Sequence, residues 1–154
     1  MQTKSYYNSP FGRLVLISEN NHLLHLAFHD EWPDIAIGEE KVLTQTRNEL
    51  DEYFAGKRQK FNVPIHLAGT PFQLRVWQEL QTIPFGEKIS YQALAEKAAR
   101  PNACRAAGTA NKGNPIAIIV PCHRVIQKSG AIGGYYGEPY RKDFLLRHEA
   151  KVCS

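Results

Sequence analysis

Turn residues divide the first third of the sequence into short apolar runs. Strand composition is found in Lys4–Tyr7, Leu14–Ile17 and Leu23–Phe28. The residues between them favour tight turns: Asn8-Ser9-Pro10 with Gly12, and then Asn20-Asn21. The pattern predicts an antiparallel meander.

A helix and a linker follow the predicted sheet. Apolar residues recur at helical spacing over 42–54, and Gly56 supplies a stop. The stretch His66–Thr70 then has the character of a linker. We therefore expect two domains, a support domain over residues 1–66 and a second domain over residues 71–154.

Helical spacing dominates the chain beyond this linker. Pro71 opens a helix that ends near Pro84, and a second helix begins after Ser90, a good N-cap residue. A third helix is expected from Asn102 to about Lys112. Two short helices joined by a tight turn make a candidate helix-turn-helix, although many small helical domains contain such pairs.

Positive charge is concentrated in the second half of the chain. Residues 1–69 carry 7 basic and 9 acidic side chains, whereas residues 70–154 carry 12 basic and 6 acidic ones. This excess suits a polyanionic partner, but an ordinary soluble surface would explain it equally well. No apolar run approaches the roughly 20 residues of a membrane helix, and Met1–Ser9 is polar where a signal peptide is apolar. We expect a cytoplasmic protein with no membrane partner.

The cysteine pattern argues against disulfides and metal sites. Cys104, Cys122 and Cys153 show no C-x-x-C spacing and cannot all pair, so at least one thiol is expected to be free. Three histidines lie within residues 22–29, with no cysteine near them, and we interpret them as strand and loop residues. The sequence predicts no metal and no cofactor.

One cysteine follows an apolar run in the second half. Ile116–Val120 has the composition of a buried strand, and Pro121-Cys122-His123-Arg124-Val125 comes directly after it. A thiol at the end of a buried strand, beside an imidazole and a guanidinium, has the surroundings of an activated nucleophile. At a reference pKa of about 8.5 only about 3% of a thiol is ionised at pH 7, so a base or a positive field could greatly increase its reactivity.

The segment Ile119–Val125 resembles the active-site motif of the O6-alkylguanine-DNA alkyltransferases, also called methylated-DNA–protein-cysteine methyltransferases. The resemblance covers residues 71–154 closely and residues 1–66 only in general character. The other matching segments are Phe85-Gly86-Glu87, Ser90-Tyr91, Arg105-Ala106, Asn114-Pro115, Gly133-Gly134-Tyr135, Arg141-Lys142 and Leu145–Glu149. The resemblance implies an α+β fold. A small antiparallel sheet with a helix, ribonuclease-H-like, would precede a winged-helix-like domain with the helix-turn-helix and the active-site cysteine.

The resemblance also implies a reaction. Cys122 would attack the alkyl carbon of O6-alkylguanine in DNA and keep the alkyl group as a thioether, so each protein would react once. Glu149, His123 and a bridging water would form the relay that removes the thiol proton. The Tyr91 hydroxyl would donate to the departing guanine. Whether O4-alkylthymine is a second substrate stays open.

Access to the damaged base would come from the third helix, which the resemblance places in the minor groove of double-stranded DNA. Arg105 would fill the space left by the flipped nucleotide. The other predicted DNA-binding residues are Ala106, Ala107, Gly108, Arg124 and Asn114. Asn114 would also be the hinge between this helix and the active-site strand. The predicted substrate pocket consists of Val125, Tyr135, Tyr136 and Lys142, and the protein would act as a monomer.

Two other functions stay open at this point. A cysteine hydrolase built on Cys122 and His123 would turn over, although catalytic Cys and His residues usually meet only in space. A winged-helix DNA-binding protein without chemistry would be unaffected by Cys122→Ala.

Overall fold

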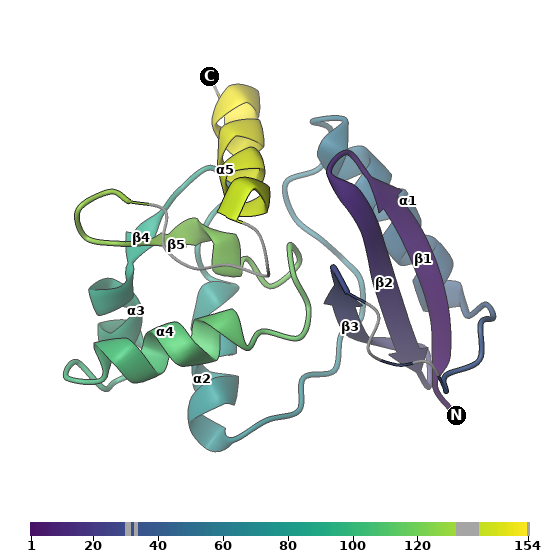
Figure 1. Cartoon of the computed structure of the whole chain (residues 1–154), viewed down its shortest axis with the longest axis horizontal. Helices are drawn as coiled ribbons and strands as arrows, with labels where there is room; N and C mark the ends of the chain where they lie inside the picture. Colours follow the sequence, from purple (N-terminus) through teal and green to yellow (C-terminus); the bar gives the residue numbers. More distant parts are fainter. Residues whose placement is uncertain (30–31, 33, 132–138, 154) are drawn as a thin grey trace. The chain divides into compact units, whose positions relative to one another are not determined.

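The chain divides into two units, Met1–Leu67 and Ala68–Ser154, in a computed structural model that describes residues 1–29, 32, 34–131 and 139–153 (Figure 1). Helices and a small antiparallel sheet confirm the predicted α+β class. Within those described ranges, no helix combines the length and the apolar character needed to cross a membrane.

A three-stranded antiparallel sheet forms the centre of the first unit (Figure 1). Its strands are β1 (Thr3–Ser9), β2 (Gly12–Glu19) and β3 (His22–Ala27). Asn20 and Asn21 join β2 to β3 with φ angles of 52° and 58°. Two successive positive φ angles are typical of a type I′ hairpin turn, and asparagine tolerates them. The predicted meander is confirmed.

Extended segments pair with both edges of this sheet. The backbone N–H and C=O of Lys4 in β1 bond to segment 36–38, at 2.9 and 3.0 Å. The same two groups of Leu23 in β3 bond to segment 64–66, each at 2.9 Å. Both outer strands therefore have partners for part of their backbone.

Helix α1 (Lys41–Phe54) completes the first unit and contacts the sheet. Its buried stripe includes Leu43, Leu50 and Tyr53, all without exposed surface. The Asn21 side chain accepts from the first turn of α1, with Oδ1 2.9 Å from the Val42 nitrogen. The hairpin turn thus also fixes the start of the helix.

Side-chain caps begin the first two helices of the second unit. At α2 (Pro71–Leu80), Thr70 Oγ1 accepts from the Gln73 nitrogen at 3.1 Å, and the Gln73 side chain accepts in return from the Thr70 nitrogen at 2.9 Å. At α3 (Tyr91–Lys97), the Ser90 hydroxyl accepts from the Ala93 nitrogen at 3.0 Å. The predicted starts of both helices are confirmed.

The third helix, α4 (Cys104–Lys112), packs against α2 and α3. Trp77 of α2 donates from Nε1 to the Ala110 carbonyl of α4 at 2.8 Å, in a buried position. The predicted helix pair is confirmed. The last helix of the pair begins at Cys104 instead of Asn102.

The strand predicted over Ile116–Val120 is wrong, because this segment forms successive turns. Asn114 is 1% exposed, and its Nδ2 donates to the carbonyls of Ile116 and Val120 at 3.2 and 2.7 Å. Its Oδ1 accepts from the Ile116 nitrogen at 3.0 Å. These bonds satisfy backbone groups that a strand would pair with a sheet. Ile118 has a φ of 70°, outside the strand region.

A short 3-10 helix, η1 (Cys122–Arg124), follows these turns and leads into β5 (Val125–Ile126). Strand β5 pairs in parallel with β4 (Ile89–Ser90), immediately before α3. The last helix, α5 (Pro139–Cys153), contacts η1. Its buried face carries Lys142, Leu145 and Glu149, at the three- and four-residue spacings expected of a helix.

Candidate active site

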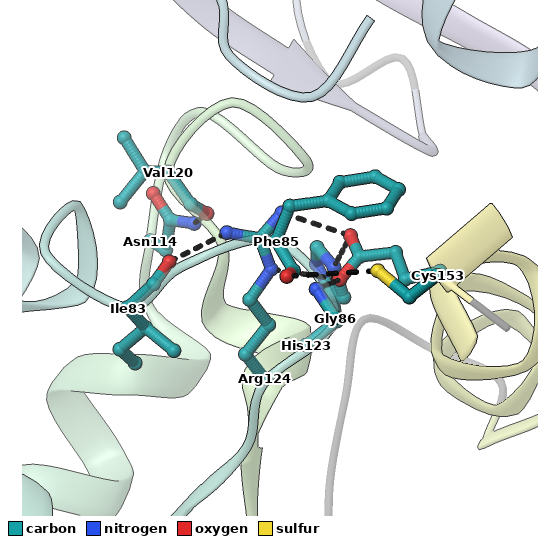
Figure 2. A network of polar contacts seen from close by, with 9 residues as sticks. Ile83, Phe85, Gly86, Asn114, Val120, His123, Arg124 and Cys153 are labelled. Carbon is teal, nitrogen blue, oxygen red and sulfur yellow. Dashed lines mark hydrogen bonds and ion pairs between the residues drawn. The ribbon is translucent and has the colours of Figure 1, made fainter. Parts of the chain in front are cut away.

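The Glu149 carboxylate is the centre of a buried polar network (Figure 2). Its Oε2 lies 2.7 Å from His123 Nε2 and accepts from Arg124 Nη2 at 2.9 Å. Its Oε1 accepts from Arg124 Nε at 2.9 Å and from the Gly86 nitrogen at 3.1 Å. Burial alone would raise the pKa of Glu149, but the bonds and charges of His123 and Arg124 hold it well below its usual range. The carboxylate is therefore ionised at neutral pH.

The His123 imidazole has no exposed surface, and its two nitrogens have different surroundings. Nε2 faces Glu149, whereas Nδ1 is buried without a hydrogen-bond partner among the described residues. Burial lowers the pKa of His123; Glu149 acts against this, and the charges of Arg124 and Lys142 add to it. A neutral ring with its proton on Nε2 presents Nδ1 as a proton acceptor.

The Cys122 thiol is 1% exposed and begins η1 directly before His123. Burial raises the pKa of Cys122 to about 11, although a hydrogen bond with Asn114 and the charge of Lys142 act in the opposite direction. The sequence predicts an activated thiol, but the resting thiol is neutral, because burial outweighs the positive field. Ionisation of Cys122 requires a base or a change of environment.

Tyr91 and Lys142 form a second polar pair in the same unit. Lys142 has no exposed surface, and its Nζ donates to the Tyr91 hydroxyl at 3.3 Å. Burial lowers the pKa of Lys142 to about 8, and the Cys122 thiol acts in the opposite direction. The ammonium occupies an acceptor position of the hydroxyl oxygen and so directs the O–H away from Lys142.

The exposed face of α4 separates two grooves. One groove, of about 600 Å³, is lined by Tyr91, Cys104, Arg105, Gly108, Thr109, Lys112 and Gln127. The other, of about 580 Å³, is lined by Phe72, Gln73, Asn102, Ala103, Arg105, Ala106, Thr109 and Ala110. Arg105 and Thr109 line both grooves and therefore stand on the ridge between them. Arg105 and Ala106 are exposed and Gly108 is partly exposed, as expected for DNA-binding residues.

Three predicted DNA-binding residues do not lie on this face. Ala107 has no exposed surface and faces the core formed with α2 and α3. Asn114 bonds to buried backbone in its own turn, as described above, and to the Cys122 thiol, and it lies between α4 and the cysteine, as the predicted hinge requires. Arg124 is 5% exposed and bound to Glu149. All three side chains are buried in this structure, and their assignment to DNA binding stays a prediction from the sequence.

Only part of the predicted substrate pocket can be placed. Lys142 lies beside Tyr91, and Val125 is fully buried in β5. Tyr135 and Tyr136 lie outside the described residues. The Cys122 carbonyl accepts from the Val125 nitrogen and from Asn111 Nδ2, the latter at 3.2 Å.

Sequence reasoning missed Asn111 and the true position of Arg124. Asn111 is 2% exposed and connects α4 directly to the Cys122 backbone. It falls four residues after Ala107 on the same stripe of α4, so helical spacing could have identified it as an inward-facing polar residue. The groove walls contributed by Phe72 and Gln127 have no comparable signal, because they depend on tertiary packing.

Within the described residues, no cluster of three or more His, Cys, Asp or Glu side chains is arranged to hold a metal ion. All three cysteines are free thiols.

Comparison with known proteins gives matches over nearly the whole chain. The family model for the ribonuclease-like domain of 6-O-methylguanine DNA methyltransferase matches residues 3–67, and the model for its DNA-binding domain matches residues 71–151. The methylated-DNA–protein-cysteine methyltransferase of Mycobacterium leprae is 45% identical over 146 residues, covering 92% of this chain and 88% of the relative.

Two further relatives extend this result. The constitutive methylated-DNA–protein-cysteine methyltransferase of Bacillus subtilis is 41% identical over 157 residues, covering 94% of this chain and 95% of the relative. The crystal structure of Mycobacterium tuberculosis OGT in complex with DNA superposes with a TM-score of 0.89 at 40% identity, covering 98% of this chain and 93% of that one.

Proposed function

The chain belongs to the 6-O-methylguanine DNA methyltransferase family, and from this premise we propose that it repairs DNA by irreversible transfer of an alkyl group from guanine O6 to Cys122. The observation that carries the proposal is the buried Glu149–His123 pair, with Oε2 and Nε2 2.7 Å apart, whose histidine directly follows the buried Cys122 in the chain. The names of its relatives describe transfer from methylated DNA to a protein cysteine. One protein molecule repairs one lesion.

The transfer is a displacement at the alkyl carbon. The Cys122 sulfur forms a bond to that carbon as the bond from carbon to O6 breaks, and the electron pair of the broken bond stays on guanine. The thiol proton leaves to His123, and the departing guanine takes a proton from water, so that a neutral base is released. The product thioether has no good leaving group and no acyl carbon that water could attack, so the protein is not regenerated.

His123 is the proton acceptor in this scheme. The bond to Glu149 holds the proton of the neutral ring on Nε2, which leaves the Nδ1 lone pair to accept the thiol proton through a bridging water. Since the pKa of Cys122 is raised by burial, the base is needed for the thiolate to form. Glu149 then stabilises the imidazolium.

Tyr91 and Lys142 act on the guanine side of the reaction. Lys142 orients the Tyr91 hydroxyl so that its O–H can be donated to the departing base, where negative charge develops. The positive charge of Lys142 near the thiol also favours the thiolate. The substrate pocket of this proposal is the one the family resemblance predicts, namely Lys142 with Val125, Tyr135 and Tyr136.

Double-stranded DNA carrying O6-alkylguanine binds the exposed face of α4. Arg105, on the ridge between two grooves, enters the stack in place of the flipped nucleotide, while Ala106 and Gly108 allow close approach of the sugar-phosphate backbone. We assign residues 71–154 to DNA binding and transfer, and residues 1–66 to support. The protein acts as a monomer, since one chain supplies every group in the scheme. Its cytoplasmic location stays a prediction from the sequence.

Mass spectrometry of the intact protein tests the proposal. After incubation with duplex DNA containing O6-methylguanine, we expect one methyl group per molecule, mapped by peptide analysis to Cys122. The matched control is Cys104→Ser/Cys153→Ser, which retains only the proposed nucleophile and should gain the same mass. An unmodified protein with altered DNA would indicate a hydrolase, and an unmodified protein with unaltered DNA would indicate a binding protein without chemistry.

A further inference from the structure

Arg124 holds Glu149 through two parallel hydrogen bonds. Nε and Nη2 each lie 2.9 Å from a different carboxylate oxygen, the fork geometry in which arginine pairs best with a carboxylate. Its remaining terminal nitrogen, Nη1, donates to the Ile83 carbonyl at 2.7 Å, and the guanidinium lies 5.6 Å from the centre of the Phe85 ring (Figure 2). The side chain is fixed at both ends of the guanidinium.

We propose that Arg124 is a positioning residue for transfer: its fixed charge on Glu149 keeps the His123 imidazole neutral and therefore able to accept the Cys122 proton. The inference rests on the proposed function. It concerns a residue that the family resemblance placed among the DNA-binding residues.

Charge balance inside the network gives the physical reason. Glu149 is the negative group facing His123, and the positive groups facing it are Arg124 and Lys142. The Arg124 charge already compensates the Glu149 carboxylate. A proton added to His123 in the resting site would therefore share the single Glu149 charge with Arg124 and leave the buried network with an excess positive charge, which is costly. Without Arg124, the same proton would compensate Glu149.

Arg124 has a second consequence for the direction of proton transfer. Because both carboxylate oxygens accept from Arg124, Glu149 is a weak base and does not take the Nε2 proton from His123. The ring is thereby kept as the Nε2–H tautomer, and Nδ1 is the nitrogen that can receive a proton. Positioning of the carboxylate and neutrality of the ring come from the same guanidinium.

Two substitutions separate the charge of Arg124 from its fork geometry. Arg124→Gln removes the charge and keeps a polar side chain that can donate to Glu149 or to Ile83. Arg124→Lys keeps the charge and loses the fork. NMR titration of the His123 ring, followed through its side-chain nitrogen shifts, measures protonation directly and does not depend on transfer.

We expect Arg124→Gln to raise the midpoint of the His123 titration by about one pH unit or more, the size typical of losing one nearby like charge. The acidic limb of the single-turnover rate should move to higher pH by the same amount, with the rate recovering above the new midpoint. Arg124→Lys should leave the His123 midpoint close to that of the parent protein. Circular dichroism verifies that each variant is folded.

Three results would overturn the inference. They are an unchanged or lowered His123 midpoint in Arg124→Gln, a rate lost equally at every pH, or a large rise of the midpoint in Arg124→Lys. The comparison of the His123 midpoint in Arg124→Lys with that of the parent protein can still overturn the inference if Arg124→Gln does not fold. Failure of the parent protein to form a Cys122 adduct would instead refute the proposed function, and the NMR titration would still show whether Arg124 keeps His123 neutral.

Discussion

Each unit of the molecule contains a buried glutamate, and the two differ in what they can do. Glu49 on α1 is 5% exposed and accepts from the Asn62 nitrogen at 2.7 Å and from Gln45 Nε2 at 2.8 Å. Its third neighbour is Arg58, whose Nη1 lies 3.5 Å away. Glu149 has the same kinds of partner: an arginine, a backbone N–H from a distant loop and one further side chain. Both carboxylates therefore tie a loop to a helix.

The further side chain makes the difference between them. Gln45 has an amide, which neither gains nor loses a proton near neutral pH, whereas His123 has an imidazole that can do both. His123 is also the neighbour of a buried thiol. A buried glutamate with an arginine is thus a structural device in either unit, and it gains a chemical use only where a base and a nucleophile are next to it.

Removal of the nucleophile is the most severe test of this contrast. Cys122→Ala should abolish transfer completely, while affinity for duplex DNA persists, because that affinity comes mainly from contacts on the exposed face of α4. Mass spectrometry and a gel-shift titration measure the two properties separately. Stoichiometric transfer by Cys122→Ala would show that the buried network beside Cys122 is structural, like that of Glu49.

The second test removes the charge of the carboxylate beside the base. Glu149→Gln leaves the buried Arg124 guanidinium without a counter-charge, so we expect a loss of about 3–5 kcal/mol in the free energy of unfolding. Transfer should also slow by about 100-fold or more, since His123 loses the group that orients it and stabilises its charged form. Urea denaturation and single-turnover kinetics at a temperature where the variant is folded check both numbers. A normal rate in the folded variant would remove Glu149 from the relay.

How far the sequence predicts this molecule depends on the kind of signal. Asn20-Asn21, Pro71 and Ser90 act through local backbone chemistry, so the strands and helix starts they imply were predicted from the sequence. The apolar run 116–120 gave no such signal. This segment can be buried in the form of turns because the Asn114 side chain bonds to its backbone N–H and C=O groups. Composition does not reveal such a contact.

The candidate site follows the same division. Family resemblance identified Cys122, His123 and Glu149 and their order along the chain, and the structure brings the latter two into contact. It could not tell that Arg124 points inward, because a motif records which residue is present and not which way its side chain faces. The burial of Ala107 was missed for a similar reason: small residues suit a DNA-facing surface and a tight helix contact equally well.

A substitution on α4 shows how far function extends beyond the buried network. Arg105→Ala should lower the single-turnover rate on saturating duplex DNA by about 10- to 1,000-fold. Unstacking the flipped base costs a few kcal/mol, and without the Arg105 side chain in its place nothing offsets this cost. A free O6-substituted guanine base needs no flipping and should react almost as fast as with the parent protein. Equal losses on duplex and free base would point to a damaged fold. Full recovery of the duplex rate at low salt would reduce Arg105 to a phosphate contact.

Tyr91→Phe examines the polar pair on the guanine side and keeps the aromatic ring. Loss of one hydrogen bond to the departing base should slow transfer by about 10- to 1,000-fold, on duplex DNA and on the free base alike. This equal effect distinguishes Tyr91 from Arg105. An unchanged rate on both substrates would assign the Tyr91–Lys142 contact to packing alone.

The smallest effect is expected for Glu49→Gln, the matched control for Glu149→Gln. The amide oxygen of the new side chain can still accept from the Asn62 nitrogen, and the Gln45 amide can turn so that its Oε1 accepts from the new NH2 group. Both bonds then lose the negative charge that strengthened them. Arg58 is not left without a counter-charge, since its Nε remains 2.8 Å from Glu52 and its side chain is 23% exposed. We therefore expect a loss of about 1–2 kcal/mol in stability, in the range of one buried hydrogen bond. Single-turnover rates on the free base and on duplex DNA should both stay within about twofold of the parent protein. A loss of transfer as large as that of Glu149→Gln would mean that the first unit takes part in the chemistry, and the contrast between the two glutamates would fail.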